Sequence, residues 1–216
     1  MKKILRKGDT FFDVGANLGQ YIFRFRNFDN SGLKIFAFEP VLSNYNMVNG
    51  KIMNNKNVVF ENLALSDKKE DSMLFIPLID GIEIDTQASL NLENRQMYYK
   101  DFRKQEIKVT TLDDYCDANN ITNIDILKID TEGNDAKVVN GGNVIIKNSR
   151  PVIMAEDIIE TDAFYLLQDI GYKTFFADSK WVLHTHTSDT PGLIKDLTVM
   201  IPDTRINLLK GQIALE

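Results

Sequence analysis

Short apolar runs alternate along the chain with longer segments in which apolar residues recur at helical spacing. Most of the runs are apolar at consecutive positions, which is typical of strands that are buried on both faces of a parallel sheet. The segments between them have the pattern of helices with one buried face. The expected strands lie at 11–14, 36–39, 57–65, 124–130, 151–156, 172–176 and 196–201.

This alternation predicts an α/β fold with a doubly wound sheet. We expect a mostly parallel, seven-stranded, Rossmann-like sheet that ends in a C-terminal antiparallel hairpin formed by the last two runs. Antiparallel and short strands are expected at 72–76 and 107–110, outside this core pattern. Together these elements make a single domain over residues 1–216.

Two segments carry no clear periodicity, residues 79–105 and residues 178–195. The first is expected to be irregular, and it is long for a passive connection in a compact domain. We therefore expect both segments to form loops on the substrate side. Arginine, lysine and tyrosine side chains in the first loop could contact a polar or anionic acceptor, although a surface insertion without function would look the same.

Composition narrows the class of protein. The chain has 216 residues, 44% of them hydrophobic, and a net charge of −6, which argues against a nucleic-acid backbone as the main partner. Cys116 is the single cysteine, so the sequence predicts neither an internal disulfide nor a cysteine metal cluster, and it fits a reducing cytoplasm. No apolar run is long enough to span a membrane, and the basic start is not followed by the apolar core of a signal peptide. We expect a cytoplasmic protein and leave its oligomeric state open.

A glycine turn follows the first expected strand. Gly15 comes directly after the strand, and Gly19 opens the next helical segment. Glycine lets the backbone turn sharply and approach a ligand. The dinucleotide fingerprint G-x-G-x-x-G is broken, because Asn17 stands in place of its middle glycine. Asp13, at the end of the strand, suits a cationic amine such as that of S-adenosylmethionine, so the turn favours this cofactor over a dinucleotide.

Glu39 ends the second expected strand about 20 residues past the glycine turn, where an acid that binds ribose hydroxyls is expected. One carboxylate can accept hydrogen bonds from both hydroxyls. An ordinary α/β unit with a tight turn and a surface acid would show parts of this pattern. The register of Asp13, Gly15, Gly19 and Glu39 on successive strands favours the cofactor.

A second group of acids follows the strand expected to be central. Asp130 and Glu132 are two residues apart, so in an extended chain they point to the same side, at the sheet edge where ligands bind. Neighbouring carboxylates raise the pKa of one of the pair. These acids could contact the sulfonium end of the cofactor, orient a substrate hydroxyl or hold a metal. Alternatively, Glu132 caps the helix that follows Gly133.

Six blocks of the chain, in this order, closely resemble the FkbM family of S-adenosylmethionine-dependent methyltransferases. The blocks are FDVGANLG at 12–19, FEP at 38–40, NLALSD at 62–67, VTTLDD at 109–114, IDILKIDTEG at 124–133 and RPVIMAE at 150–156. They cover most of residues 9–172. Asn134 and Asp135 depart from the family, which usually has a bulkier apolar residue there.

The resemblance implies a class I methyltransferase fold and O-methylation of a hydroxyl on a sugar, glycan or secondary metabolite. It implies that the glycine turn lines the methionine part of the cofactor, that the acid of the second strand binds the ribose, and that the third block lies near the adenine. The implied cofactor-binding residues are Asp13, Gly15, Asn17, Gly19, Glu39, Ala64, Leu65, Ser66, Asp67 and Asp130.

An unactivated hydroxyl gains about 10²–10⁴-fold from a general base. The candidates are Asp130, Glu132, Glu156, His184 and His186, the last two being the only histidines of the chain. The histidines could equally be incidental residues of a surface loop. We expect no resident metal, but acids at neighbouring strand ends, Asp130 and Glu156, leave magnesium-assisted O-methylation open.

Three further hypotheses remain open. The chain could be a catalytically silent cofactor-binding module in an assembly, which predicts cofactor binding without turnover. A nicotinamide dehydrogenase is disfavoured by the missing middle glycine. A nucleic-acid methyltransferase is disfavoured by the absence of a basic stripe and of an Asn/Asp-Pro-Pro-aromatic motif.

Overall fold

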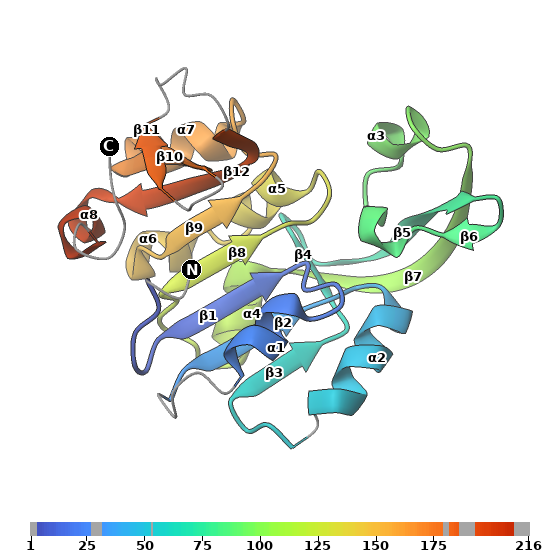
Figure 1. The fold of residues 1–216 in the computed structure, drawn as a ribbon, viewed down its shortest axis with the longest axis horizontal. Helices are drawn as coiled ribbons and strands as arrows, with labels where there is room; N and C mark the ends of the chain where they lie inside the picture. The colour runs from blue at the N-terminus through green and yellow to red at the C-terminus, as the bar shows by residue number, and fades with distance from the viewer. Residues whose placement is uncertain (1–3, 27–31, 53, 179–181, 186–192, 210–216) are drawn as a thin grey trace.

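A computed structural model of the protein describes residues 4–26, 32–52, 54–178, 182–185 and 193–209. Its main sheet has the strand order β11-β10-β12-β9-β8-β1-β2-β3 (Figure 1). The strands are β1 Thr10–Val14, β2 Lys34–Phe38, β3 Val58–Glu61, β8 Ile126–Ile129, β9 Val152–Ala155, β10 Tyr172–Asp178, β11 Leu183–Thr185 and β12 Leu193–Pro202.

The direction of the strands confirms the α/β prediction. The pairs formed among β3, β2, β1, β8 and β9 are all parallel. β12 is antiparallel to both β9 and β10, and it forms the expected C-terminal hairpin with β10. The seven expected strands are all present, and the short edge strand β11 adds an eighth, antiparallel to β10.

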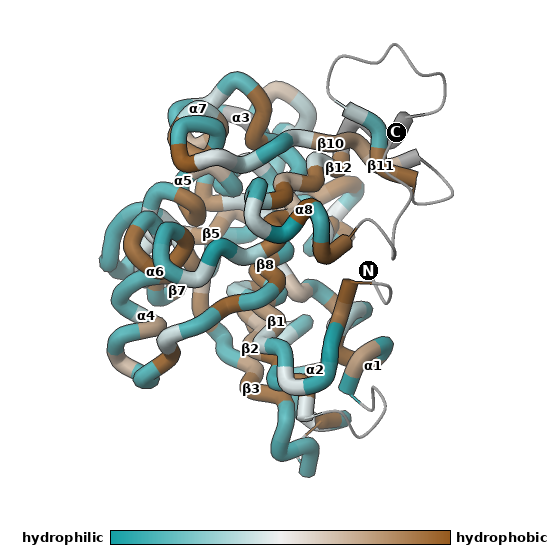
Figure 2. Tube along the Cα trace, turned by 90° about the vertical axis from the view of Figure 1, so that its left-hand side faces the viewer, coloured by the Kyte–Doolittle hydropathy of each residue, from teal (hydrophilic) through white to brown (hydrophobic). Residues whose placement is uncertain are grey.

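Helices cover both faces of this sheet, as a doubly wound fold requires. They are α1 Gln20–Phe25, α2 Leu42–Ile52, α4 Leu112–Ala118, α5 Asp135–Asn140, α6 Asn143–Ser149, α7 Asp162–Asp169 and α8 Asp203–Leu209. The view along the sheet shows α4 and α6 on one side and α1 and α2 on the other (Figure 2). None of the helices in the described part of the chain has the length and apolar character needed to cross a bilayer.

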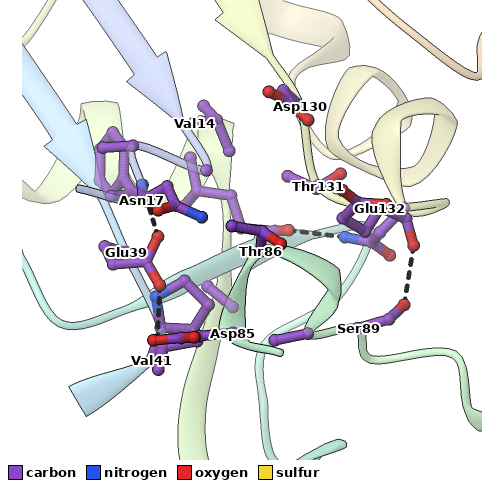
Figure 3. Close-up of a pocket in the computed structure, with 18 of the residues that line it drawn as sticks. Val14, Asn17, Glu39, Val41, Asp85, Thr86, Ser89, Asp130, Thr131 and Glu132 are labelled. Carbon is purple, nitrogen blue, oxygen red and sulfur yellow. Dashed lines mark hydrogen bonds between the residues drawn. The ribbon is translucent and has the colours of Figure 1, made fainter. Parts of the chain in front are cut away.

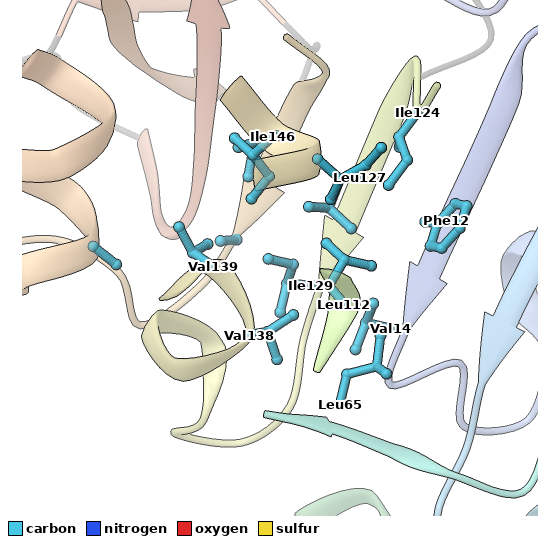
Figure 4. Close-up of a cluster of buried hydrophobic side chains, with 14 of the residues drawn as sticks. Phe12, Val14, Leu65, Leu112, Ile124, Leu127, Ile129, Val138, Val139 and Ile146 are labelled. Carbon is cyan, nitrogen blue, oxygen red and sulfur yellow. The ribbon is translucent and has the colours of Figure 1, made fainter. Parts of the chain in front are cut away.

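The consecutive apolar residues of the strands divide between the two faces. In β8, Leu127 and Ile129 pack under α4–α7 with Val138 and Ile146, while Ile126 packs on the opposite side with α1 and α2 (Figure 4). All four residues of β8 are buried. This double burial explains why the run is apolar apart from Lys128 and why β8 is central.

The sequence led us to expect an irregular segment at residues 79–105, but the structure has regular elements there. β5 Glu70–Ile79 and β7 Asp101–Thr111 form a long antiparallel pair in a second sheet of order β4-β7-β5-β6, with β4 Ala64–Ser66 and β6 Ile82–Glu83. Between them lie the 3-10 helix η1 Asp85–Gln87 and the helix α3 Leu92–Gln96. We call residues 70–111 the arm, and Figure 1 shows it extending from the carboxyl side of the main sheet.

The expected strand at 57–65 is also divided by the structure. β3 stays in the main sheet, while β4 pairs in parallel with β7 of the arm. The arm has a small core of its own, in which Leu74, Ile76, Ile107 and Val109 pack with Val41. It is thus a packed element beside the main sheet.

Candidate cofactor and acceptor site

A cavity of about 390 Å³ opens between the carboxyl ends of the central strands and the arm. It is lined mainly by residues 14–18, 38–41, 63–65, 85–90 and 130–132. This volume falls in the usual range for small-molecule sites, about 300–1,000 Å³. The chain runs from β1 to β2 on one side and reaches β8 on the other, so the cavity lies at the switch point of the sheet, where ligands of open α/β folds bind.

The glycine turn forms one wall of this cavity. Gly15 has φ +74°, and a Cβ there would lie 1.8 Å from the carbonyl oxygen of Asp130, so no side chain fits. Asn17 is left-handed at φ +48°, and its Oδ1 accepts a 2.7 Å hydrogen bond from the backbone N–H of Leu18. Gly19 does not line the cavity; a Cβ there would lie 2.9 Å from Val48, so its role is close packing of α1 on α2.

Glu39 lies across the cavity from the β8 turn, and 4% of it is exposed. Its Oε2 accepts from the backbone N–H of Asn17 at 2.7 Å and its Oε1 from that of Val41 at 2.8 Å (Figure 3). Each carboxylate oxygen has a second lone pair, so both can still accept from a ligand's hydroxyls. Burial raises the pKa of Glu39 to about 7, although the two backbone N–H groups oppose the shift.

Asp13 does not lie where the sequence led us to expect it. The residue is fully buried and does not line the cavity. Lys128 Nζ lies 3.2 Å from its Oδ1 and 3.4 Å from Asp130 Oδ2, and it donates a 2.8 Å hydrogen bond to the carbonyl of Gly15. Burial alone would lower the pKa of Lys128, but the Asp13 and Asp130 carboxylates raise it above its usual value, so the lysine stays charged.

Lys128 therefore holds the glycine turn against β8, and sequence reasoning missed it. Its signal was a charged residue in the middle of the apolar run Ile-Leu-Lys-Ile, which demands a buried partner. Asp130 does line the cavity, as expected, next to Gly15.

Asn134 and Asp135, which depart from the family pattern, are buried and bonded. Asp135 accepts from the N–H and hydroxyl of Thr131 and from the N–H of Glu156, so it joins the ends of β8 and β9. Asn134 donates to the carbonyl of Leu65 at 2.9 Å, and its Oδ1 accepts from the Ser66 hydroxyl at 3.2 Å. The two polar residues thus fix the floor of the cavity.

The third block of the family pattern reaches the cavity only in part. Ala64 and Leu65 line it, but Ser66 and Asp67 do not. Ser66 is buried against Asn134, and Asp67 is exposed. The expectation that Ser66 and Asp67 face the cofactor is therefore not met by their positions.

Glu132 lines the cavity, and each of its carboxylate oxygens accepts a hydrogen bond from the arm. Gln87 Nε2 donates to its Oε1 at 2.9 Å and Arg95 Nη2 to its Oε2 at 2.7 Å. The Ser89 hydroxyl donates to its backbone oxygen at 2.8 Å (Figure 3). All three donors belong to the arm. The structure thus attaches the candidate base Glu132 to the arm, and this arrangement was not visible in the sequence because its partners lie 37 to 45 positions away.

Glu156 follows β9 at the same sheet edge, beside the β8 turn. Burial and the nearby Asp130, Asp135, Glu132 and Asp157 carboxylates raise its pKa to about 7. Its carboxylate forms no hydrogen bond with the described part of the chain. A carboxylate with this pKa can exchange a proton near neutral pH.

His184 does not join this site. His184 is buried in the edge strand β11, opposite Phe176, and does not line the cavity. Four strand spacings separate β11 from β8, about 19 Å at the usual spacing. The prediction of a catalytic role for His186 lies outside the described residues. Within those residues, no group of three or more His, Cys, Asp and Glu side chains has the arrangement of a metal site.

A doubly wound sheet with a small-molecule cavity at its switch point, beside a glycine turn and a strand-end acid, defines a class of nucleotide-cofactor-binding proteins. The model of the methyltransferase FkbM domain matches residues 13–187, which is most of the chain. The chain therefore belongs to the FkbM methyltransferase domain family.

A solved structure agrees on the fold. The methyltransferase FkbM of Methylobacillus flagellatus KT is similar with a TM-score of 0.56 at 11% sequence identity; the match covers 91% of this chain and 44% of that chain, so the present chain spans less than half of its length. A precorrin-6y C5,15-methyltransferase of Geobacter metallireducens GS-15 aligns at 12% identity with a TM-score of 0.45, over 92% of this chain and 81% of that one. No curated protein matches the sequence significantly. The fold is that of the class I methyltransferases.

Proposed function

We propose that the chain binds S-adenosylmethionine in the cavity and transfers its methyl group to a hydroxyl of a sugar, glycan or secondary metabolite. The observation that carries this proposal is the pairing of the Gly15 turn with the Glu39 carboxylate on one wall of the cavity at the switch point. The family model adds that its members are methyltransferases.

The lining fits this cofactor in three respects. Gly15 lines the cavity, and the absence of a Cβ lets its backbone lie against the Asp130 carbonyl and keeps the turn tight at the cavity wall. Glu39 offers free lone pairs for the two ribose hydroxyls. Asp130 lines the cavity beside the turn, where a carboxylate favours the cationic methionine end.

The charge of the lining favours an uncharged acceptor. Among the described residues that line the cavity, Glu39, Asp85, Asp130 and Glu132 are acidic and Lys128 is basic. The positive charge of Arg95 is not available to an acceptor, because Arg95 is paired with Glu132. A phosphorylated sugar would meet a negative field here, whereas a neutral hydroxyl compound would not.

When bound, S-adenosylmethionine supplies an electrophilic methyl group on a sulfonium centre. The protein's part is to hold the acceptor oxygen in line with that group, which can lower the barrier by about 7–11 kcal/mol. We assign the removal of the hydroxyl proton to Glu156, which lies outside the cavity lining but follows β9 beside the β8 turn, and whose pKa of about 7 suits that step at neutral pH. Its carboxylate is also left without a hydrogen bond within the described residues.

A transfer screen tests this proposal. The protein is incubated with methyl-tritiated S-adenosylmethionine and a panel of neutral sugars, their phosphates and hydroxylated metabolites. We expect label in a neutral hydroxyl compound, and a Glu156→Gln variant that transfers about 10²-fold more slowly or worse. Exposed Glu160→Gln, in the turn after β9, is the matched control. Cofactor binding with no label in any acceptor would favour the alternative of a silent binding module.

A further inference from the structure

We infer that Glu132 is a positioning residue that holds the arm over the cavity and so fixes the wall against which the acceptor binds. This inference rests on the proposed function, since the wall has a role only if an acceptor enters the cavity. It assigns to the acid of the Asp130–Gly133 turn a task different from proton transfer.

Three groups of the arm converge on this one residue. Gln87 and Arg95 each bind one carboxylate oxygen, at 2.9 and 2.7 Å, and Ser89 binds the backbone oxygen at 2.8 Å. Hydrogen bonds between charged groups are the stronger ones, so the Arg95 contact carries most of the attachment. The three donors lie on different parts of the arm, which restrains both its shift and its rotation.

The arm residues are themselves held in place. Arg95 is 9% exposed, and its Nη1 donates to Gln87 Oε1 at 2.9 Å, so the side chains of Arg95, Gln87 and Glu132 close a ring. Ser89 is 1% exposed, and its backbone pairs with Phe75 of β5. The hydrogen bonds to Glu132 therefore fix the position of the whole arm relative to the β8 turn.

The backbone of Glu132 supports this role. Its φ is +55°, a left-handed value that is uncommon for residues other than glycine. Such a conformation persists only where surrounding contacts over-determine it. Here those contacts come from the arm, which is what a docking point for the arm requires.

The held segment is the one that lines the cavity. Residues 85–90 run from η1 past the Ser89 contact and line the cavity next to the β8 turn, to which Gln87 and Ser89 are hydrogen-bonded. Glu39 and the glycine turn lie on the other wall, attached to β1 and β2. Releasing the arm should therefore weaken acceptor binding and leave cofactor binding nearly unchanged.

Two variants test the inference without knowledge of the acceptor. Glu132→Gln and Arg95→Met each remove the ion pair. Arg103→Met is the matched control, because Arg103 pairs with Glu83 within the arm and does not reach β8. Amide hydrogen exchange is followed over residues 85–96, and binding of S-adenosylhomocysteine is followed by calorimetry.

We expect exchange over residues 85–96 to rise about tenfold or more in Glu132→Gln and Arg95→Met, and to stay as in the wild type in Arg103→Met. The affinity for S-adenosylhomocysteine should change less than about threefold in all variants, because the arm and the wall formed by Glu39 and the glycine turn are separate parts of the cavity. Unchanged exchange in both ion-pair variants would overturn the inference. If the wild type failed to bind S-adenosylhomocysteine while exchange rose as expected, the proposed function would fail and the attachment would stand.

Kinetics with the acceptor found in the transfer screen separate positioning from proton transfer. Positioning predicts that KM for the acceptor rises in both ion-pair variants, that Arg95→Lys recovers part of the loss, and that the double variant is no worse than either single one. A large fall of kcat in Glu132→Gln alone, with KM unchanged in Arg95→Met, would show that Glu132 acts as a base and contradict the inference.

Discussion

At the scale of single residues, Gly15 occupies a position where the backbone conformation and the neighbouring Asp130 carbonyl exclude any side chain. It combines a φ of +74° with a Cβ site 1.8 Å from the Asp130 oxygen. We predict that Gly15→Ala lowers the free energy of unfolding by about 2 kcal/mol or more, because both strain and a backbone clash are introduced.

The matched control is Gly50→Ala in α2. Nothing lies within 4 Å of a Cβ at Gly50, so the alanine is accommodated. We expect it to raise the free energy of unfolding by about 0.5–1 kcal/mol through helix propensity. Urea unfolding of the two variants measures both effects. Equal stability of the two would contradict the geometry at Gly15.

Single residues also show where sequence reasoning succeeds. Gly15 and Glu39 could be predicted, because a glycine turn and a strand-end acid are local patterns with a fixed spacing. Lys128, Arg95 and Asn134 could not, because their partners come from strands and helices that meet only in the folded chain. For the same reason Asp13 was assigned to a ligand, although its partner is a lysine of the neighbouring strand.

At the scale of elements, the Asp13–Lys128 pair joins the two central strands β1 and β8. Both side chains are buried, with Asp13 fully so. We predict that Lys128→Met lowers the free energy of unfolding by about 3–5 kcal/mol, because it leaves the Asp13 charge buried without a partner.

The double variant Asp13→Val with Lys128→Met serves as the control for this pair. Replacing a buried ion pair by apolar side chains of similar volume is often nearly neutral, so we expect most of the loss to be recovered. Chemical denaturation of the single and double variants is the measurement. If the losses of the single variants simply added, the pairing would carry no coupling energy.

The main sheet was predictable, whereas only the strand segments 72–76 and 107–110 of the arm were, and the difference is physical. Strands buried on both faces must be apolar at every position, which gives a strong signal. β7 is largely exposed or half-buried and reads Asp-Phe-Arg-Lys-Gln-Glu-Ile-Lys-Val-Thr-Thr, so its pattern resembles that of a surface loop. Its structure comes from pairing with β5 over nine register positions, a contact that sequence periodicity does not reveal.

At the scale of the whole molecule, the acidic edge of the sheet makes stability depend on pH. Glu156 has a pKa of about 7 in the folded protein, above its usual value of 4.5, because of burial and the neighbouring acids. The folded state thus binds a proton more tightly than the unfolded state. The contribution of Glu156 to stability is full below the usual pKa and is lost as the pH rises through the folded pKa.

We therefore predict that Glu156→Gln narrows the difference in Tm between about pH 5 and about pH 8, because the variant has no proton to lose at this site. As the pH rises over this range, the Tm of the wild type should fall further than the Tm of the variant. The measurement is thermal unfolding of both proteins at the two pH values. An identical pH dependence would show that Glu156 titrates at its ordinary pKa.

The claim on which the account depends is that the Gly15 turn and Glu39 hold S-adenosylmethionine. Calorimetric titration with S-adenosylhomocysteine tests it most directly, with wild type, Glu39→Ala and Glu61→Ala compared. Glu61 ends the adjacent strand β3 outside the cavity lining, so it is the matched control. We expect the wild type and Glu61→Ala to bind alike and Glu39→Ala to bind at least about tenfold more weakly, since two charge-assisted hydrogen bonds are lost. Equal binding by Glu39→Ala, or no binding by the wild type, would contradict the account.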